Sequence, residues 1–154
     1  MSEQRAVAAL EEAGVSYRLV RHGEVSNAQE AAAARGVDVA DLAKTIVVRR
    51  GNDDYVFVLV PGDAEIAWPH LRQVLGVRRL SLPDAAEAKD ATGYVRGTIT
   101  PFGATRCWPV VVDERFRGRT IALGAGAHGV AAVVPADEMI RALGATVAPI
   151  STPV

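Results

Sequence analysis

Two apolar segments joined by a short polar turn place the strongest constraint on the fold. Residues 45–50 and 55–60 are rich in β-branched and aromatic side chains, which favour strands. The residues between them, Gly51-Asn52-Asp53-Asp54, have the composition of a tight turn. The second segment is apolar at every position, as expected for a buried strand. The pattern therefore predicts a β-hairpin with one strand inside the protein.

Helical and extended patterns alternate along the rest of the chain. Helices are predicted at residues 2–13, 27–35, 39–43, 68–75, 83–90 and 136–143, and Ser26 with Gln29 forms a capping box for the second. Further strands are predicted at residues 17–21, 77–80, 108–113, 119–123, 130–134 and 146–150. Several connections are too short for parallel crossovers. We therefore expect an α/β fold of the α+β type, a single domain over residues 1–154 in which helices surround one curved, mixed β-sheet.

The composition excludes several classes of protein. No apolar run approaches the roughly 20 residues that a membrane-spanning helix needs, and the first residues lack the pattern of a signal peptide. The single cysteine, Cys107, excludes an internal disulfide, and its neighbour Trp108 leads us to expect a buried thiol. We therefore expect a cytoplasmic protein without a membrane partner.

The charged residues narrow the possible partners. The net charge of −1 gives the molecule no general attraction for polyanions, so a nucleic acid would have to bind a local basic patch. One candidate patch consists of Arg49, Arg50, Arg78 and Arg79, which are otherwise the solvated ends of strands. All but two of the 17 cationic residues are arginine, so Lys44 and Lys89 stand out. Lys44 is either a functional ammonium or the end of a short helix paired with Asp41.

Residues 92–103 form the most unusual stretch of the chain. Three glycines, one proline and three threonines occur within twelve residues (Thr-Gly-Tyr-Val-Arg-Gly-Thr-Ile-Thr-Pro-Phe-Gly). Glycine permits backbone conformations that other residues avoid, and proline restricts φ. The stretch is therefore either a shaped loop that positions binding groups or a tight connection between strands.

Residues 124–129 match the Gly-x-Gly-x-x-Gly pattern of dinucleotide-binding loops. In such proteins a helix follows the loop, whereas residues 130–134 have the pattern of a strand. A helix there would favour a dinucleotide-dependent oxidoreductase, and a strand would exclude one. The three histidines, His22, His70 and His128, lack the spacing of metal ligands. Because no signature of a dedicated nucleophile is present either, we expect no metal and no cofactor.

Three segments, taken in order, carry a family resemblance. They are residues 41–48 (Asp-Leu-Ala-Lys-Thr-Ile-Val-Val), residues 92–103, and residues 124–129 with the helix start at 135–137. Together they resemble the YbaK family, the free-standing relatives of the editing domain of bacterial prolyl-tRNA synthetases. The resemblance implies an enzyme that hydrolyses the ester between tRNA for proline and a wrong small amino acid such as alanine or cysteine. A synthetase pocket rejects such amino acids by only ~1–3 kcal/mol per methylene, so a second site must remove the errors.

The resemblance also implies roles for particular residues. Lys44 would hold the terminal phosphate or the ester at the 3′ end of the tRNA. Backbone groups of the substrate-binding loop, Gly97, Thr98, Ile99, Thr100 and Pro101, would fix the aminoacyl group and stabilise the developing oxyanion. The other residues expected to line the pocket are His22, Asn27, Gly126 and His128.

Two routes of attack follow from the resemblance. Water oriented by the ribose 2′-hydroxyl is one, and the substrate's own thiol is the other where cysteine is attached; neither needs a protein general base, a metal or a cofactor. The expected partner is mischarged tRNA, with prolyl-tRNA synthetase and an elongation factor as further candidates, and the oligomeric state is open. The alternative function is a non-catalytic module that binds an aminoacyl or nucleotide ligand in the same pocket.

Overall fold

The structure, a computed structural model, describes residues 2–154. Its α-helices are α1 (Ser2–Glu12), α2 (Ala28–Arg35), α3 (Trp68–Leu75), α4 (Ala85–Thr92) and α5 (Ala136–Leu143), with 3₁₀ helices η1 (Val39–Asp41) and η2 (Glu114–Phe116). Its strands are β1 (Arg18–Arg21), β2 (Ala43–Gly51), β3 (Asp54–Pro61), β4 (Ala64–Ile66), β5 (Val110–Asp113), β6 (Thr120–Gly124), β7 (Val130–Pro135), β8 (Thr146–Ala148) and β9 (Ser151–Pro153). No helix in the described range is both long and apolar enough to cross a membrane.

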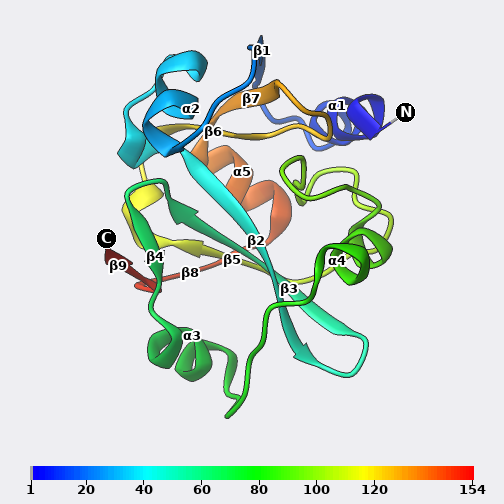
Figure 1. The fold of residues 1–154 in the computed structure, drawn as a ribbon, viewed down its shortest axis with the longest axis vertical. Coiled ribbons are helices and arrows are strands. Elements are labelled where there is room, and N and C mark those ends of the chain that lie inside the picture. The colour runs from blue at the N-terminus through cyan, green and yellow to red at the C-terminus, as the bar shows by residue number, and fades with distance from the viewer. Residues whose placement is uncertain (1) are drawn as a thin grey trace.

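The strands form a mixed arrangement that helices surround (Figure 1). The largest sheet has the order β2-β3-β5-β8, with β2 antiparallel to β3 and the other neighbours parallel. An antiparallel sheet has the order β1-β7-β6, and β4 pairs with β9. The predicted hairpin and mixed α/β fold are confirmed, although the strands divide among three sheets rather than one. A parallel bridge between Leu42 and Ala122 connects the two larger sheets next to the start of β2.

The apolar core covers both faces of β3. On one face, Phe57 belongs to a cluster with Met139 of α5. On the other face, Val58 packs in a cluster with Leu71 of α3, the helix at the lower end of the molecule in Figure 1. Because alternate side chains of a strand point to opposite faces, burial of both faces requires an apolar residue at every position. This explains the uniform apolar pattern of residues 55–60.

The cap of α2 differs from the prediction by one residue. Asn27, not Ser26, is the N-cap, and its Oδ1 accepts a hydrogen bond from the Glu30 N–H at 2.8 Å. Glu30 in turn accepts from the Ser26 N–H at 3.1 Å, so the reciprocal capping pattern is present but displaced from the Ser26–Gln29 pair. Asn27 therefore shapes the start of α2 and lies outside the cavity walls described below.

Two further predictions are wrong. Residues 77–80 form no strand, since only Ser81 pairs with β2, opposite Arg49, where a register shift between Arg49 and Gly51 interrupts the strand. Cys107 is exposed rather than buried. The ring of Trp108 turns inward, edge-on to Tyr55 at 5.2 Å between centroids, and neighbouring side chains of an extended segment point to opposite sides.

Candidate functional site

The Thr92–Gly103 segment is a loop held by its own hydrogen bonds. Within it, Val95 to Thr98 make a tight turn, in which the Thr98 N–H and hydroxyl both donate to the Val95 carbonyl, at 3.0 and 2.7 Å. Gly97 occupies the third position of this turn with φ +90°. That conformation is strained for any residue with a side chain, which explains a glycine there.

Helix α1 anchors the loop from outside. Arg5 donates to the carbonyls of Gly93 and Gly103 at 2.9 and 3.2 Å, and its guanidinium lies 5.0 Å from the centre of the Tyr94 ring. The Tyr94 hydroxyl donates to the Phe102 carbonyl at 2.6 Å. Burial raises the pKa of Tyr94, so its hydroxyl keeps the proton that this bond needs. The loop therefore has a fixed shape.

A second glycine-rich loop, residues 124–129, packs against the first. The Gly126 N–H donates to the Thr98 carbonyl at 3.0 Å. A Cβ on Gly124 would lie 3.1 Å from the Ile99 carbonyl oxygen, and one on Gly126 would lie 2.7 Å from the Ser2 carbonyl oxygen. Both positions therefore require close backbone approach. Strand β7 begins directly after this loop, which excludes the dinucleotide-binding arrangement.

Lys44 lies inside β2 rather than at the end of a helix. The predicted helix at 39–43 is only the short η1, because β2 begins at Ala43. Asp41 does not pair with Lys44; its carboxylate binds Arg119. The Lys44 ammonium instead donates to the main-chain carbonyl of Ala64, which leaves two of its three N–H groups without an acceptor in residues 2–154.

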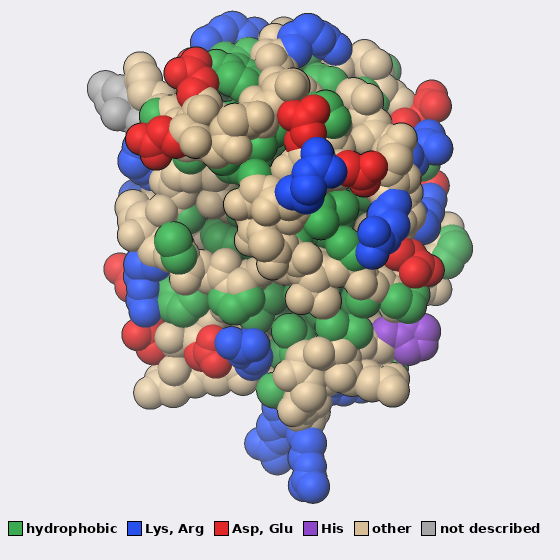
Figure 2. Space-filling model, turned by 180° about the vertical axis from the view of Figure 1, so that it is seen from behind, with side chains coloured by type: hydrophobic (Ala, Val, Ile, Leu, Met, Phe, Trp, Pro, Cys, Tyr) green, Lys and Arg blue, Asp and Glu red, His purple; other side chains and the backbone are tan. Residues whose placement is uncertain are grey.

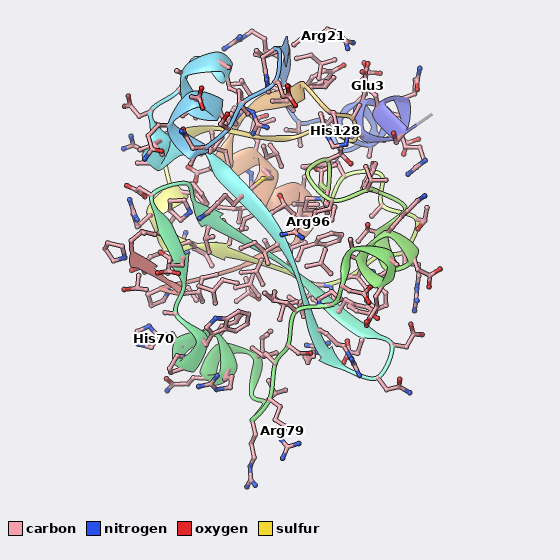
Figure 3. The ribbon with its side chains drawn as sticks, in the orientation of Figure 1. Glu3, Arg21, His70, Arg79, Arg96 and His128 are labelled. Carbon is pink, nitrogen blue, oxygen red and sulfur yellow. The ribbon has the colours of Figure 1, made fainter. Side chains whose placement is uncertain are left out.

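Three adjoining cavities share Gly97 in their walls. The Lys44 cavity, of about 230 Å³, is lined by residues that include Arg35, Lys44, Thr45, Gly97, Ile99 and Gly124. The His22 cavity, of about 360 Å³, includes His22, Glu24, Arg35, Gly97 and His128. The Leu82 cavity, of about 560 Å³, includes Thr45, Leu82, Asp84, Arg96, Gly97 and Ile99. Figure 3 shows Arg96 over β2 and His128 above it.

The candidate residues divide into two groups. Gly97 and Ile99 line the Lys44 cavity, while His22 and His128 lie in the wall of the neighbouring His22 cavity. Thr98, Thr100, Pro101 and Gly126 do not line these cavities. Thr98 and Thr100 are 1% exposed, and their hydroxyls bond within the loop. This second group supports the loop rather than facing the cavities.

Two loop residues that line the Lys44 cavity have backbone donors without an acceptor. The N–H groups of Gly97 and Ile99 have no hydrogen-bond acceptor within residues 2–154. Among the described residues, those lining this cavity include no carboxylate, imidazole or thiol. The lining therefore combines two cationic residues with two free N–H groups, which suit an anion or a polarised carbonyl, and its only side chains that could act as acid or base are those of Lys44 and Arg35.

Sequence reasoning missed two residues of the site. Arg35 ends an alanine-rich helix and looks like an ordinary cation at a helix C-terminus, yet it lines two cavities. Thr45 has its hydroxyl buried without a hydrogen-bond partner among the described residues. The only sequence signal for Arg35 was that it is the single cation in an alanine-rich run. The only signal for Thr45 was that it follows Lys44.

The four arginines proposed as a basic patch lie together, with a fifth. Arg49, Arg50, Arg72, Arg78 and Arg79 line a hollow of about 470 Å³, here called the arginine groove. Arg49 pairs with Glu87 at 3.8 Å and Arg50 with Asp54 at 3.0 Å, whereas Arg72, Arg78 and Arg79 have no ion pair in the described chain. Cationic side chains project from this lower end in Figure 2, and Figure 3 places Arg79 far from His128.

Comparison with known proteins gives the following matches. Residues 22–142 match the model of the aminoacyl-tRNA editing domain. The chain is 28% identical over 148 residues to the multifunctional Ser/Thr-tRNA deacylase ProXp-y of Escherichia coli (strain K12), which covers 92% of this chain and 87% of that protein. It is 24% identical over 104 residues to a candidate Cys-tRNA(Pro)/Cys-tRNA(Cys) deacylase, EbsC, of Enterococcus faecalis, covering 67% and 63% of the two chains.

The same fold occurs in solved structures. One, described as that of a candidate trans-editing enzyme for prolyl-tRNA synthetase, superposes with a TM-score of 0.87 at 24% identity. The superposition covers 98% of this chain and 97% of that one.

Proposed function

Because the chain belongs to the aminoacyl-tRNA editing domain family, it is an aminoacyl-tRNA deacylase, and we propose that it removes wrong small amino acids from tRNA for proline at the Lys44 cavity. The family resemblance drawn from the sequence is thereby confirmed. The observation that carries the proposal is one cavity whose lining brings Lys44 together with Gly97 and Ile99, two loop residues whose N–H groups have no acceptor within residues 2–154.

The proposed chemistry needs positioning and electrostatics rather than a protein nucleophile. The aminoacyl ester is already activated, and its carbonyl oxygen gains negative charge when it is attacked. The N–H groups of Gly97 and Ile99 donate to that oxygen, and Lys44 supplies positive charge nearby. Water held by the ribose 2′-hydroxyl attacks the carbonyl carbon, the ester bond to the ribose oxygen breaks, and that oxygen takes up the proton, which gives free amino acid and tRNA. Where cysteine is attached, its own thiol attacks instead, and the amino acid leaves as a cyclic thiolactone with the same ribose oxygen as leaving group. The absence of a carboxylate, imidazole or thiol among the described lining residues agrees with both routes.

The walls of the cavity favour small side chains with a hydroxyl or thiol. Its lining includes the aliphatic side chains of Leu42 and Ile99, and Thr45 brings the buried hydroxyl that has no partner in residues 2–154. A buried hydroxyl without a partner costs about 1–3 kcal/mol. Rotation about χ1 exchanges the positions of the threonine hydroxyl and methyl group and would turn the hydroxyl of Thr45 toward the cavity. There it could bond to a polar atom of the substrate, which would recover this cost. The proposal therefore ranks serine, threonine and cysteine above alanine.

A panel of mischarged tRNAs tests the function. Purified protein is mixed with tRNA for proline carrying alanine, cysteine, serine or threonine at one fixed salt concentration, and amino-acid release is timed. We expect release of the polar amino acids about two- to tenfold faster than alanine, the value of one hydrogen bond. Release of none of the four would overturn the proposal, whereas alanine as the fastest substrate would remove only the role of Thr45.

The arginine groove is proposed to contact the phosphate backbone of the tRNA body. Three of its guanidinium groups are free of ion pairs within the described chain, and no acidic residue lines it. A molecule of net charge −1 depends on such a local surface to attract RNA.

Replacing Arg72, Arg78 and Arg79 together by glutamine is expected to weaken tRNA binding and its salt dependence. Each phosphate contact adds nearly one to the slope of log affinity against log salt, so we expect the slope to fall by about 2–3. Filter binding between low and moderate salt measures this slope. The control is Arg117→Gln with Arg141→Gln, two exposed arginines outside the groove. An unchanged slope in the triple variant would place the tRNA body elsewhere.

A further inference from the structure

Arg35 occupies the wall between two cavities. It is the last residue of α2, which Gly36 ends with φ +76°. Within residues 2–154 it is the only residue with a charged side chain that lines both the Lys44 cavity and the His22 cavity. A ligand that extends from one cavity into the other therefore passes Arg35.

The guanidinium of Arg35 is short of partners. Its Nε–H donates to Nε2 of His22 over a long 3.4 Å, and the other ring nitrogen of His22 contacts the Gly23 carbonyl at 2.8 Å. Because a carbonyl oxygen can only accept, Nδ1 of His22 is the donor in that second contact. The two Nη groups of Arg35 carry four N–H donors that have no acceptor within the described residues.

No carboxylate neutralises Arg35. It forms no ion pair within residues 2–154, in contrast to Arg21, Arg50 and Arg119, which bind carboxylates. Glu24 also lines the His22 cavity, but no ion pair joins Glu24 to Arg35 within residues 2–154. Burial lowers the pKa of Arg35, although a guanidinium remains charged at neutral pH. A part-buried cation without a counter-ion is costly unless a ligand supplies the negative charge.

We infer that Arg35 binds the phosphodiester that precedes the 3′-terminal nucleotide of the tRNA, an inference that rests on the proposed function. With the aminoacyl group in the Lys44 cavity, that phosphate is one sugar away, and the adjoining His22 cavity, whose wall shares Arg35, offers the space for it. The planar fork of a guanidinium matches two phosphate oxygens. The Lys44 ammonium, which already donates to Ala64, is then left to act at the ester.

A double-mutant cycle between protein and substrate tests this assignment. One partner is the wild type or Arg35→Gln, and the other is mischarged tRNA whose last linkage is a phosphodiester or an uncharged methylphosphonate. We expect either change alone to lower kcat/KM by about 10- to 100-fold, the value of hydrogen bonds to a charged group. Both together are expected to cost no more than one, because they remove the same contact.

Further variants keep the inference falsifiable. Arg35→Lys keeps the positive charge without the planar guanidinium, so its kcat/KM is expected to lie between those of the wild type and Arg35→Gln. This variant also provides the test if Arg35→Gln does not fold. Arg117→Gln, exposed and outside the three cavities, is the control without an effect. Additive losses for Arg35→Gln and the methylphosphonate would overturn the inference, as would a methylphosphonate effect that disappears in Arg96→Gln instead. Wild-type protein without any deacylation would instead refute the proposed function.

Discussion

Lys44→Ala is expected to lower the rate of deacylation by about 100- to 1,000-fold, the usual effect of removing one group that stabilises an oxyanion. Lys44 lines a part-buried cavity whose described lining includes no other lysine and no carboxylate, imidazole or thiol that could take its place. The main chain of residue 44 pairs with Val60 whatever its side chain. Loss of the hydrogen bond to Ala64 is expected to lower the unfolding free energy by only about 1–3 kcal/mol.

The chain contains a matched control for this experiment. Lys89, the other lysine, is exposed on α4, so Lys89→Ala removes the same group without touching the cavities. Single-turnover release of amino acid, with tRNA affinity and thermal unfolding measured in parallel, separates the roles of Lys44. A folded Lys44→Ala protein that hydrolyses at the wild-type rate would reduce Lys44 to a support for β4, and a loss of affinity alone would make it a binding group.

Gly97→Ala is expected to reduce deacylation by about 100-fold with a small effect on stability. A residue with a side chain is strained at φ +90°, so the turn from Val95 to Thr98 is expected to relax and redirect the Gly97 N–H. The new Cβ would also lie 3.4 Å from Cε1 of His128. Misplacement of a positioning group by about 1 Å costs about 10²-fold in rate, whereas the strain itself costs about 1–2 kcal/mol.

Gly118→Ala provides the comparison for Gly97→Ala. Gly118 has φ +73°, is exposed, and has no atom within 4 Å of a built Cβ, so it carries a similar backbone cost remote from the site. Equal loss of unfolding free energy in the two variants, with activity lost only in Gly97→Ala, is the expected outcome. If Gly97→Ala hydrolyses mischarged tRNA as fast as Gly118→Ala, the loop is a structural turn and the N–H donors act elsewhere.

Local patterns were sufficient for the elements whose burial is simple. The hairpin of β2 and β3 could be predicted because both faces of β3 are covered, which leaves an uninterrupted apolar run. The strand after Gly129 could be predicted in the same way, and it excluded a dinucleotide site. Residues 77–80 misled the prediction because an extended pattern forms a strand only where a neighbouring edge offers continuous pairing, and a bulge interrupts β2 beside it.

By itself, the sequence determined the mixed α/β class, the family resemblance and the two segments, Lys44 and residues 92–103, that meet at the site. Only the tertiary structure decided which residues face the cavities. Thr98 and Thr100 hold the loop from inside, and Arg35 reaches the wall from a helix with no motif. The physical reason is that a motif encodes local backbone shape, whereas a cavity is made by side chains from separate elements. Which charges remain unpaired, as at Arg35, depends on those elements meeting.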